Sequence, residues 1–287
     1  MIIDAHAHLE IEELDAAGYV RIMDEADIDK TLLFASLCGP IPKLPTGLIA
    51  FFRRLLQSPL QPLAGRIYES LVRNGTLASG GQRVPLIEDP DNDDVARAIS
   101  EYPDRFIGFV AVNPKLANAM ETFERGIEDQ GMVGVKCHAW WHRFDPSLDL
   151  LPIARQCEAR DLPLLIHLGG GPRTGNFAGL LEQCPKLKLI LAHVGLPFFQ
   201  RCWERVRAEK NCFVDASGPY LDGRIVGRAV EALGPDKVLF GSDGPFSLRL
   251  PGGGHSYASI LQWTLDLPIS DHDRQKIFHQ NLEKLLP

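Results

Sequence analysis

Eight short apolar segments, each bounded by turn-forming residues, restrict the fold of this sequence more than any other feature. Segments that are apolar throughout are typical of strands buried on both faces of a parallel sheet. Between most of them, apolar residues recur with helical spacing, and S-D-H-D at residues 270–273 resembles the capping box of a further helix. The expected strands are 2–8, 30–36, 106–112, 134–139, 163–169, 187–195, 211–217 and 237–243, and the expected helices between them are 14–28, 91–102, 117–128, 148–160, 197–210 and 221–233.

This alternation predicts an α/β protein with a (β/α)8 TIM barrel, formed as a single domain by residues 1–287. A doubly wound open sheet is the main alternative. The count of eight strands favours the barrel, and no strand–helix turn carries the G-x-G-x-x-G of a dinucleotide-binding fold. The glycine-rich stretch 169–175 also lacks the spacing of a nucleotide-binding loop.

The connection between the second and third strands is far longer than a standard barrel unit requires. Residues 37–90 contain many prolines and glycines and two helical candidates, at 48–57 and 64–74. An insertion of this length usually forms a lid or an interface. We therefore expect a helical insertion that covers the mouth of the barrel or contacts the partner in a homodimer; a helical decoration with mobile ends and no such role is the equal alternative.

Composition excludes several classes of protein. Hydrophobic residues make up 45% and charged residues 23%, which is typical of a globular protein. A net charge of −7 disfavours nucleic acid as a partner, and no apolar run is long enough to cross a bilayer. The six cysteines are scattered without a C-x-x-C pair, and the first residues lack the basic region of a signal peptide. We expect a cytoplasmic protein with reduced thiols.

Histidines are concentrated where the expected strands end. Five of the nine lie at or near a strand carboxyl end, and an aspartate, Asp243, ends the eighth strand. In a barrel these ends open to one mouth, where active sites lie. The five histidines are His6, His8, His138, His167 and His193.

Two of these histidines are spaced to bind one metal ion. His6 and His8 are two residues apart on one strand, so both should face the same side, with Asp4 one layer below them. His167 and Asp243 would complete a set of three nitrogens and one oxygen. Such a set suits Zn²⁺, Mn²⁺, Fe²⁺ or Ni²⁺. A strand-end histidine taken alone is more often a hydrogen-bonded core residue, so the interpretation depends on the combination.

Four motifs resemble the amidohydrolase superfamily. They are D-A-H-A-H at 4–8, L-L-I-H-L-G at 164–169, L-A-H-V-G at 191–195 and F-G-S-D-G-P at 240–245. The amidohydrolase-2 branch, which includes aminocarboxymuconate-semialdehyde decarboxylase-like enzymes and lactone hydrolases, is the most similar. N-L-E-K-L-L at 281–286 resembles the closing helix of that branch.

The resemblance implies His6, His8 and His167 as metal ligands and Asp243 as both a ligand and a proton shuttle. It implies His193 as a catalytic base or as a group that polarises the substrate oxygen. A bound cation lowers the pKa of its water towards neutrality, and a carboxylate that touches that water can accept its proton. We expect one divalent metal, zinc first, with manganese, iron and nickel as alternatives.

Lys136 has two readings. In binuclear members of the superfamily a lysine at this position is carboxylated and bridges two metals, with the strand-five and strand-six histidines, here His167 and His193, holding the second ion. In mononuclear members it would contact the substrate as a cation, and we favour one metal. The full set of expected substrate-binding residues is Lys136, His138, Trp140, Arg143, Arg173 and Arg249. Guanidinium groups at a barrel mouth suit a carboxylate or phosphate.

These features predict a metal-dependent hydrolase that acts on an ester, lactone or amide bond of a small anionic molecule. The alternative on the same metal site is non-oxidative decarboxylation or hydration of an unsaturated or aromatic carboxylic acid. A metal-bound scaffold without catalysis is disfavoured, because both candidate catalytic residues, Asp243 and His193, are present.

Overall fold

All eight expected strand segments form parallel strands in the computed structural model, which describes residues 1–287. The third segment is divided into two short strands by Phe109. The strands are β1 (Ile3–Leu9), β2 (Lys30–Ala35), β6 (Phe106–Gly108), β7 (Val110–Ala111), β8 (Val135–His138), β9 (Leu164–His167), β10 (Leu189–Leu191), β11 (Cys212–Asp215) and β12 (Val238–Leu239).

The strands form two parallel sheets, β1-β2-β6 and β12-β11-β10-β9-β8-β7, which backbone hydrogen bonds join at both ends. On one side, the N–H of Phe109 donates to the Leu33 carbonyl oxygen at 2.9 Å. On the other, the N–H of Ala5 donates to the Phe240 oxygen at 2.9 Å, and the N–H of Asp243 donates to the His6 oxygen at 2.7 Å. The fold is the predicted (β/α)8 barrel.

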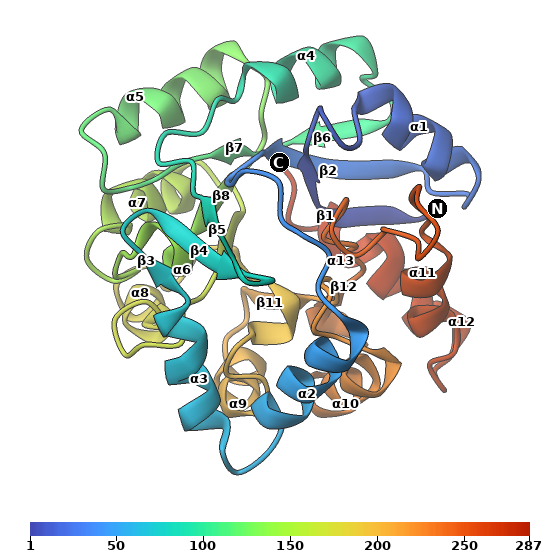
Figure 1. Ribbon diagram of the computed structural model, residues 1–287. Helices are drawn as coiled ribbons and strands as arrows, with labels where there is room; N and C mark the ends of the chain where they lie inside the picture. Colours follow the sequence, from blue (N-terminus) through green and yellow to red (C-terminus); the bar gives the residue numbers. More distant parts are fainter.

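Helices surround the strands on the outside, as Figure 1 shows. Most of them present an apolar face to the sheet, for example Ile225, Val226 and Ala229 of α10, whereas α12 buries no residue. Two of the outer helices, α8 and α11, were not among those expected from the sequence. The helices outside the insertion are α1 (Ala16–Asp24), α4 (Asp93–Glu101), α5 (Ala119–Glu124), α6 (Ala139–His142), α7 (Leu151–Ala159), α8 (Phe177–Gln183), α9 (Gln200–Ala208), α10 (Gly223–Leu233), α11 (Ala258–Leu265), α12 (Asp271–Gln275) and α13 (Asn281–Glu283).

The insertion contains the two expected helices and, in addition, a small antiparallel sheet that was not expected. Its helices are α2 (Thr46–Leu56) and α3 (Gln61–Ser70), and its strands are β3 (Val72–Arg73), β4 (Thr76–Ser79) and β5 (Gln82–Pro85). The strands are joined at Asn74–Gly75 and Gly80–Gly81, and all four of these residues have positive φ. Asn-Gly and Gly-Gly are the dipeptides that two-residue hairpin turns require, so this signal was present in the sequence.

The insertion lies across the mouth of the barrel, in front of the strands in Figure 1. It is fastened to the loops that follow β10 and β11. The Arg53 guanidinium donates to the carbonyl oxygens of Pro219 and Tyr220 and pairs with Asp222 at 3.0 Å. The Gln61 amide donates to the Pro197 oxygen at 2.8 Å.

A bulge in β1 changes which side chains face the barrel interior. Asp4 pairs with Thr31 and Ala7 with Leu33, so β1 contains one residue more than β2 over this stretch. Ile3 and Ala5 belong to the interior cluster, and after the bulge His6 and His8 face inwards instead. Asp4 therefore faces the outer layer, where Tyr257 donates to it at 2.9 Å. The expectation that Asp4 lies one layer below the two histidines was wrong, because the bulge breaks the period of two.

The core has an outer and an inner part. The larger cluster lies between the strands and helices, and the smaller fills the barrel around Phe34, Phe109 and Leu165. The six cysteines are unpaired and buried, as expected for reduced thiols. None of the helices combines the length and the apolar character needed to span a membrane.

Candidate metal centre

Three side chains from the two strands that close the barrel converge at its mouth. His6 Nε2 lies 3.4 Å and His8 Nε2 3.6 Å from Asp243 Oδ1. All three side chains are buried, and their donor atoms lie within 4.8 Å of one another. Asp243 follows the end of β12 with φ 59°, a left-handed conformation that turns the chain at this point.

The tautomer of His6 is set by Asp215, a residue that the sequence analysis missed. His6 Nδ1 lies 2.9 Å from Asp215 Oδ2, so the imidazole donates its proton there and turns the Nε2 lone pair towards Asp243. Asp215 is fully buried and also accepts hydrogen bonds from the His193 and Ser217 N–H groups. An aspartate at the end of the seventh strand was the available signal, by the same reasoning that identified Asp243.

His167 and His193 lie beside this group as a hydrogen-bonded pair. His167 Nδ1 is 3.0 Å from His193 Nε2, and the ring centroids of His6 and His193 are 4.8 Å apart. The other nitrogen of His167, Nε2, lies 2.7 Å from the hydroxyl of Tyr68. The structure therefore brings His167 into the cluster without including it among the three donors that face one another directly.

Lys136 lies behind the histidines and is not part of the cavity wall. Its side chain is fully buried, with Nζ 3.1 Å from His6 Nε2 and 4.5 Å from the centre of the Phe34 ring. Burial lowers the pKa of Lys136 to about 8, although Asp215 and Asp243 oppose the shift. Because its amine contacts His6 and does not line the cavity, Lys136 is placed to influence the histidines directly rather than to contact a substrate.

Burial keeps the imidazoles of the cluster neutral. It lowers the pKa values of His6, His8 and His167 well below the usual range, and that of His193 to about 4. Neutral imidazoles keep a lone pair on one nitrogen, which a metal ion requires. Desolvation raises the pKa of Asp243 well above its ordinary value, against the effect of Lys136.

The donor set fits a divalent cation. The carboxylate of Asp243 accepts no hydrogen bond in this structure, although it is buried and faces two imidazole nitrogens. A buried carboxylate without a partner is costly, and a bound cation would compensate its charge. Two imidazole nitrogens and one carboxylate oxygen form a partial ligand set that suits several first-row metals.

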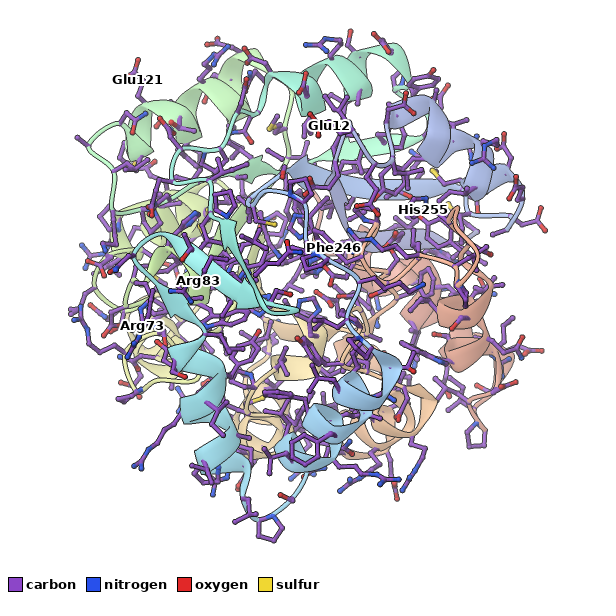
Figure 2. The ribbon with its side chains drawn as sticks, viewed as in Figure 1. Glu12, Arg73, Arg83, Glu121, Phe246 and His255 are labelled. Carbon is purple, nitrogen blue, oxygen red and sulfur yellow. The ribbon has the colours of Figure 1, made fainter.

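A cavity of about 940 Å³ opens above the cluster, and His8, His167 and Asp243 contribute to its lining. Most of the opposite wall comes from residues 41–83 of the insertion. Tyr68 and Trp140 stack with their ring centroids 3.7 Å apart, so one side of the cavity is flat and aromatic. Figure 2 shows Phe246 near the middle of the ring of strands, with Arg83 on the antiparallel sheet of the insertion.

Only some of the expected substrate-binding residues line this cavity. His138, Trp140 and Arg249 line the cavity, and the Arg249 guanidinium is paired with Glu13. Arg143 lies in a separate cleft of about 550 Å³ and pairs with Glu69 at 2.8 Å. Its φ of 56° takes the chain out of α6 and turns the side chain away from the cavity.

Arg173 is exposed in the loop after β9 and lines neither cavity. Tyr68 and Phe246, by contrast, line the main cavity and were missed. Neither carried a sequence signal that separates it from an ordinary core aromatic residue.

A ring of eight parallel strands, with imidazoles and carboxylates gathered at its carboxyl end, defines this protein as a barrel enzyme. The amidohydrolase family profile matches residues 65–287, and the chain belongs to this family. The matched region begins within α3, so it contains β8 to β12 and Asp243 but not the two histidines of β1.

Similar proteins and solved structures include decarboxylases and a probable hydrolase. Gamma-resorcylate decarboxylase from a Polaromonas species is 24% identical over 252 residues, which cover 68% of this chain and 74% of that protein. The structure of a dihydroxybenzoic acid decarboxylase from Polaromonas, with bound manganese and the inhibitor 2-nitroresorcinol, gives a TM-score of 0.61 at 18% identity over 99% of this chain and 96% of that chain. A probable 2-pyrone-4,6-dicarboxylic acid hydrolase from Acinetobacter baumannii, with citric acid bound, gives a TM-score of 0.63 at 16% identity over 99% and 98%. The two structural likenesses establish a shared fold.

Proposed function

We propose that this protein is a metal-dependent, non-oxidative decarboxylase of a hydroxylated aromatic carboxylic acid. The observation that carries the proposal is the position of the His6, His8 and Asp243 donors at the bottom of a cavity with a flat aromatic wall. The relatedness to gamma-resorcylate decarboxylase supports it. This reverses the order of the two reactions that the sequence favoured.

His6, His8 and Asp243 would hold one divalent ion, with His167 beside them as the fourth candidate ligand. A bound divalent ion supplies positive charge that attracts the carboxylate and hydroxyl oxygens of the substrate. Manganese, which the Polaromonas decarboxylase structure contains, is as good a candidate as zinc.

The protein's own side chains would orient the ring and keep water away. The stacked pair of Tyr68 and Trp140 offers a flat surface for an aromatic ring, and Phe246 lies at the cavity on the side of His8, with ring centroids 5.4 Å apart. The insertion covers the mouth and would act as a lid. A dry site strengthens each electrostatic contact with the substrate.

Decarboxylation needs one proton from the enzyme. The carbon–carbon bond to the carboxylate breaks, CO2 leaves, and the electron pair remains on the ring carbon, which then takes up a proton. Asp243 is the group best placed to deliver it, because its carboxyl group lines the cavity beside His8 and accepts no hydrogen bond. His193, at the same end of the barrel, can hold His167 in place through the hydrogen bond between the two rings.

Hydrolysis of a lactone or ester remains the second candidate. Lys136 supports it, because its amine lies 3.1 Å from His6 Nε2, close enough to the cluster to serve as the bridging ligand of a two-metal site after carboxylation. The shared fold with the probable pyrone hydrolase is consistent with this reading. His167 Nδ1 and His193 Nε2, 3.0 Å apart, would then serve the second ion.

A paired assay distinguishes the two reactions. Protein loaded with Mn²⁺ or Zn²⁺ is given ortho-hydroxybenzoates, with benzoate as the control, and separately a panel of lactones. We expect CO2 release from an ortho-hydroxybenzoate and, in D2O, one deuterium at the carbon that lost the carboxylate. Asp243→Asn should reduce the rate about 10²- to 10⁴-fold. Lactone opening without CO2 release from any acid would overturn the proposal in favour of hydrolysis.

A further inference from the structure

The phenol of Tyr68 reaches the metal-site histidines from the insertion. Tyr68 lies on α3, is 1% exposed, and places its hydroxyl 2.7 Å from His167 Nε2. Its ring stacks on Trp140, and the indole N–H of Trp140 donates to the Tyr68 carbonyl oxygen at 3.0 Å. The hydroxyl is thus held against His167 by packing as well as by its own hydrogen bond.

The proton positions on His193, His167 and Tyr68 follow from one backbone carbonyl group. His193 Nδ1 lies 3.0 Å from the Ser217 carbonyl oxygen, which can only accept, so Nδ1 carries the proton of His193 and Nε2 is a lone pair. His167 Nδ1 must then donate to His193 Nε2 in the metal-free protein. His167 Nε2 is left as an acceptor, and Tyr68 donates to it.

The two nitrogens of His167 face different parts of the molecule. Nδ1 faces His193 and, beyond it, His6, whereas Nε2 faces the insertion. The nitrogen that can offer a lone pair to an ion in the cluster is therefore Nδ1. To do so, His167 must carry its proton on Nε2, where the group within hydrogen-bonding distance is the Tyr68 oxygen.

We propose that Tyr68 is a positioning residue of the metal centre, and that its hydroxyl accepts the Nε2 proton of His167 when Nδ1 serves the ion. A phenol can do this because it donates or accepts by rotating one bond. Partners behind a metal-binding histidine fix its tautomer and its orientation. The inference rests on the metal site of the proposed function but not on the reaction catalysed there.

Helix α3 is docked on the loop that carries His167, which keeps the Tyr68 hydroxyl in place. Glu69, the next residue, accepts from the Gly170 N–H at 2.8 Å and from the Thr174 hydroxyl at 3.1 Å. Gly65 packs so tightly against Gly170 that a Cβ on Gly170 would lie 2.1 Å from the Gly65 oxygen. The insertion therefore contributes a side chain to the metal centre and also covers it.

Metal affinity of Tyr68→Phe tests the proposal without measuring turnover. Affinity for Mn²⁺ and Zn²⁺ is measured by competition with a chromophoric chelator. We expect the variant, which keeps the aromatic ring, to bind about 10- to 100-fold more weakly, the usual effect of losing such a partner. Tyr220→Phe is the matched control, because Tyr220 lines the same cavity and its hydroxyl makes no hydrogen bond; it should stay within about twofold of the wild type.

The tautomer of His167 in the wild-type protein is a second readout that does not depend on any variant folding. Long-range ¹H–¹⁵N spectra of histidine-labelled protein should show the proton on Nδ1 without metal and on Nε2 with Zn²⁺. Unchanged or tighter binding by Tyr68→Phe, or a zinc-bound His167 that keeps its proton on Nδ1, would overturn this inference alone. A wild-type protein that binds neither ion would overturn both it and the metal-dependent function.

Discussion

Replacing Lys136 with methionine should stabilise the metal-free protein near neutral pH. Lys136 is fully buried, and burial lowers its pKa from 10.5 to about 8, so the fold disfavours its charged form. Methionine has a similar length and volume and carries no charge to desolvate. The native lysine therefore lowers the free energy of unfolding, as residues of functional sites often do.

The size of the effect follows from the two pKa values. A difference between 10.5 and about 8 corresponds to about 3 kcal/mol in the free energy of unfolding. Losing the hydrogen bond from Nζ to His6 Nε2 should reduce this gain in stability by about 1 kcal/mol. The net gain of about 2 kcal/mol predicts a rise of roughly 4–8 °C in melting temperature for a domain of this size.

The gain should depend on pH with a definite sign. Because the folded-state pKa is the lower one, the cost of charged Lys136 is complete below about pH 8, and it decreases as the pH rises towards 10.5. The advantage of Lys136→Met should therefore be largest at pH 7 and should shrink above pH 8.

The assay is thermal and urea unfolding of chelator-treated wild type and Lys136→Met at pH 7, 8 and 9. Lys284→Met is the control, because Lys284 is exposed and should change the free energy of unfolding by less than about 0.5 kcal/mol. A Lys136→Met protein that is less stable than the wild type at pH 7, or whose advantage grows with pH, would refute the reasoning.

Two further predictions concern the metal site. Asp215→Asn should weaken metal binding about 10- to 100-fold, because an amide nitrogen facing His6 Nδ1 would force the His6 proton onto Nε2. Chelator competition measures the affinity, and an unchanged value would count against the assigned tautomer of His6. Adding Mn²⁺ at about 100 times its Kd should stabilise the wild type by about 2.7 kcal/mol, seen as a rise in melting temperature that a chelator reverses. The double variant His6→Ala/His8→Ala should show no such rise, and a rise that persists would place the ion elsewhere.

Much of the fold and part of the site could be predicted from the sequence because both depend on local patterns. Apolar runs of strand length that alternate with amphipathic helices form a barrel almost irrespective of detail. Once the barrel is assumed, every strand must end at the same mouth, so His6, His8 and Asp243 could be placed together from their positions alone.

Tertiary structure decided whatever depends on contacts between distant segments. Asp215 sets the tautomer of His6 from a distance of 209 residues along the chain, and Tyr68 reaches His167 from an insertion whose docking no local pattern encodes. The bulge in β1 turned Asp4 outwards, because a single extra residue exchanges the two faces of a strand.

The same limit applies to the substrate. Arg143 follows a strand that ends at the mouth, yet one left-handed residue turns it into another cleft, where it pairs with Glu69. The candidate metal ligands come from strand ends, whose positions the barrel imposes, so the sequence by itself could bring most of them together. The cavity wall comes from loops and from the insertion, whose conformations depend on packing across the whole molecule, so only the tertiary structure could define it.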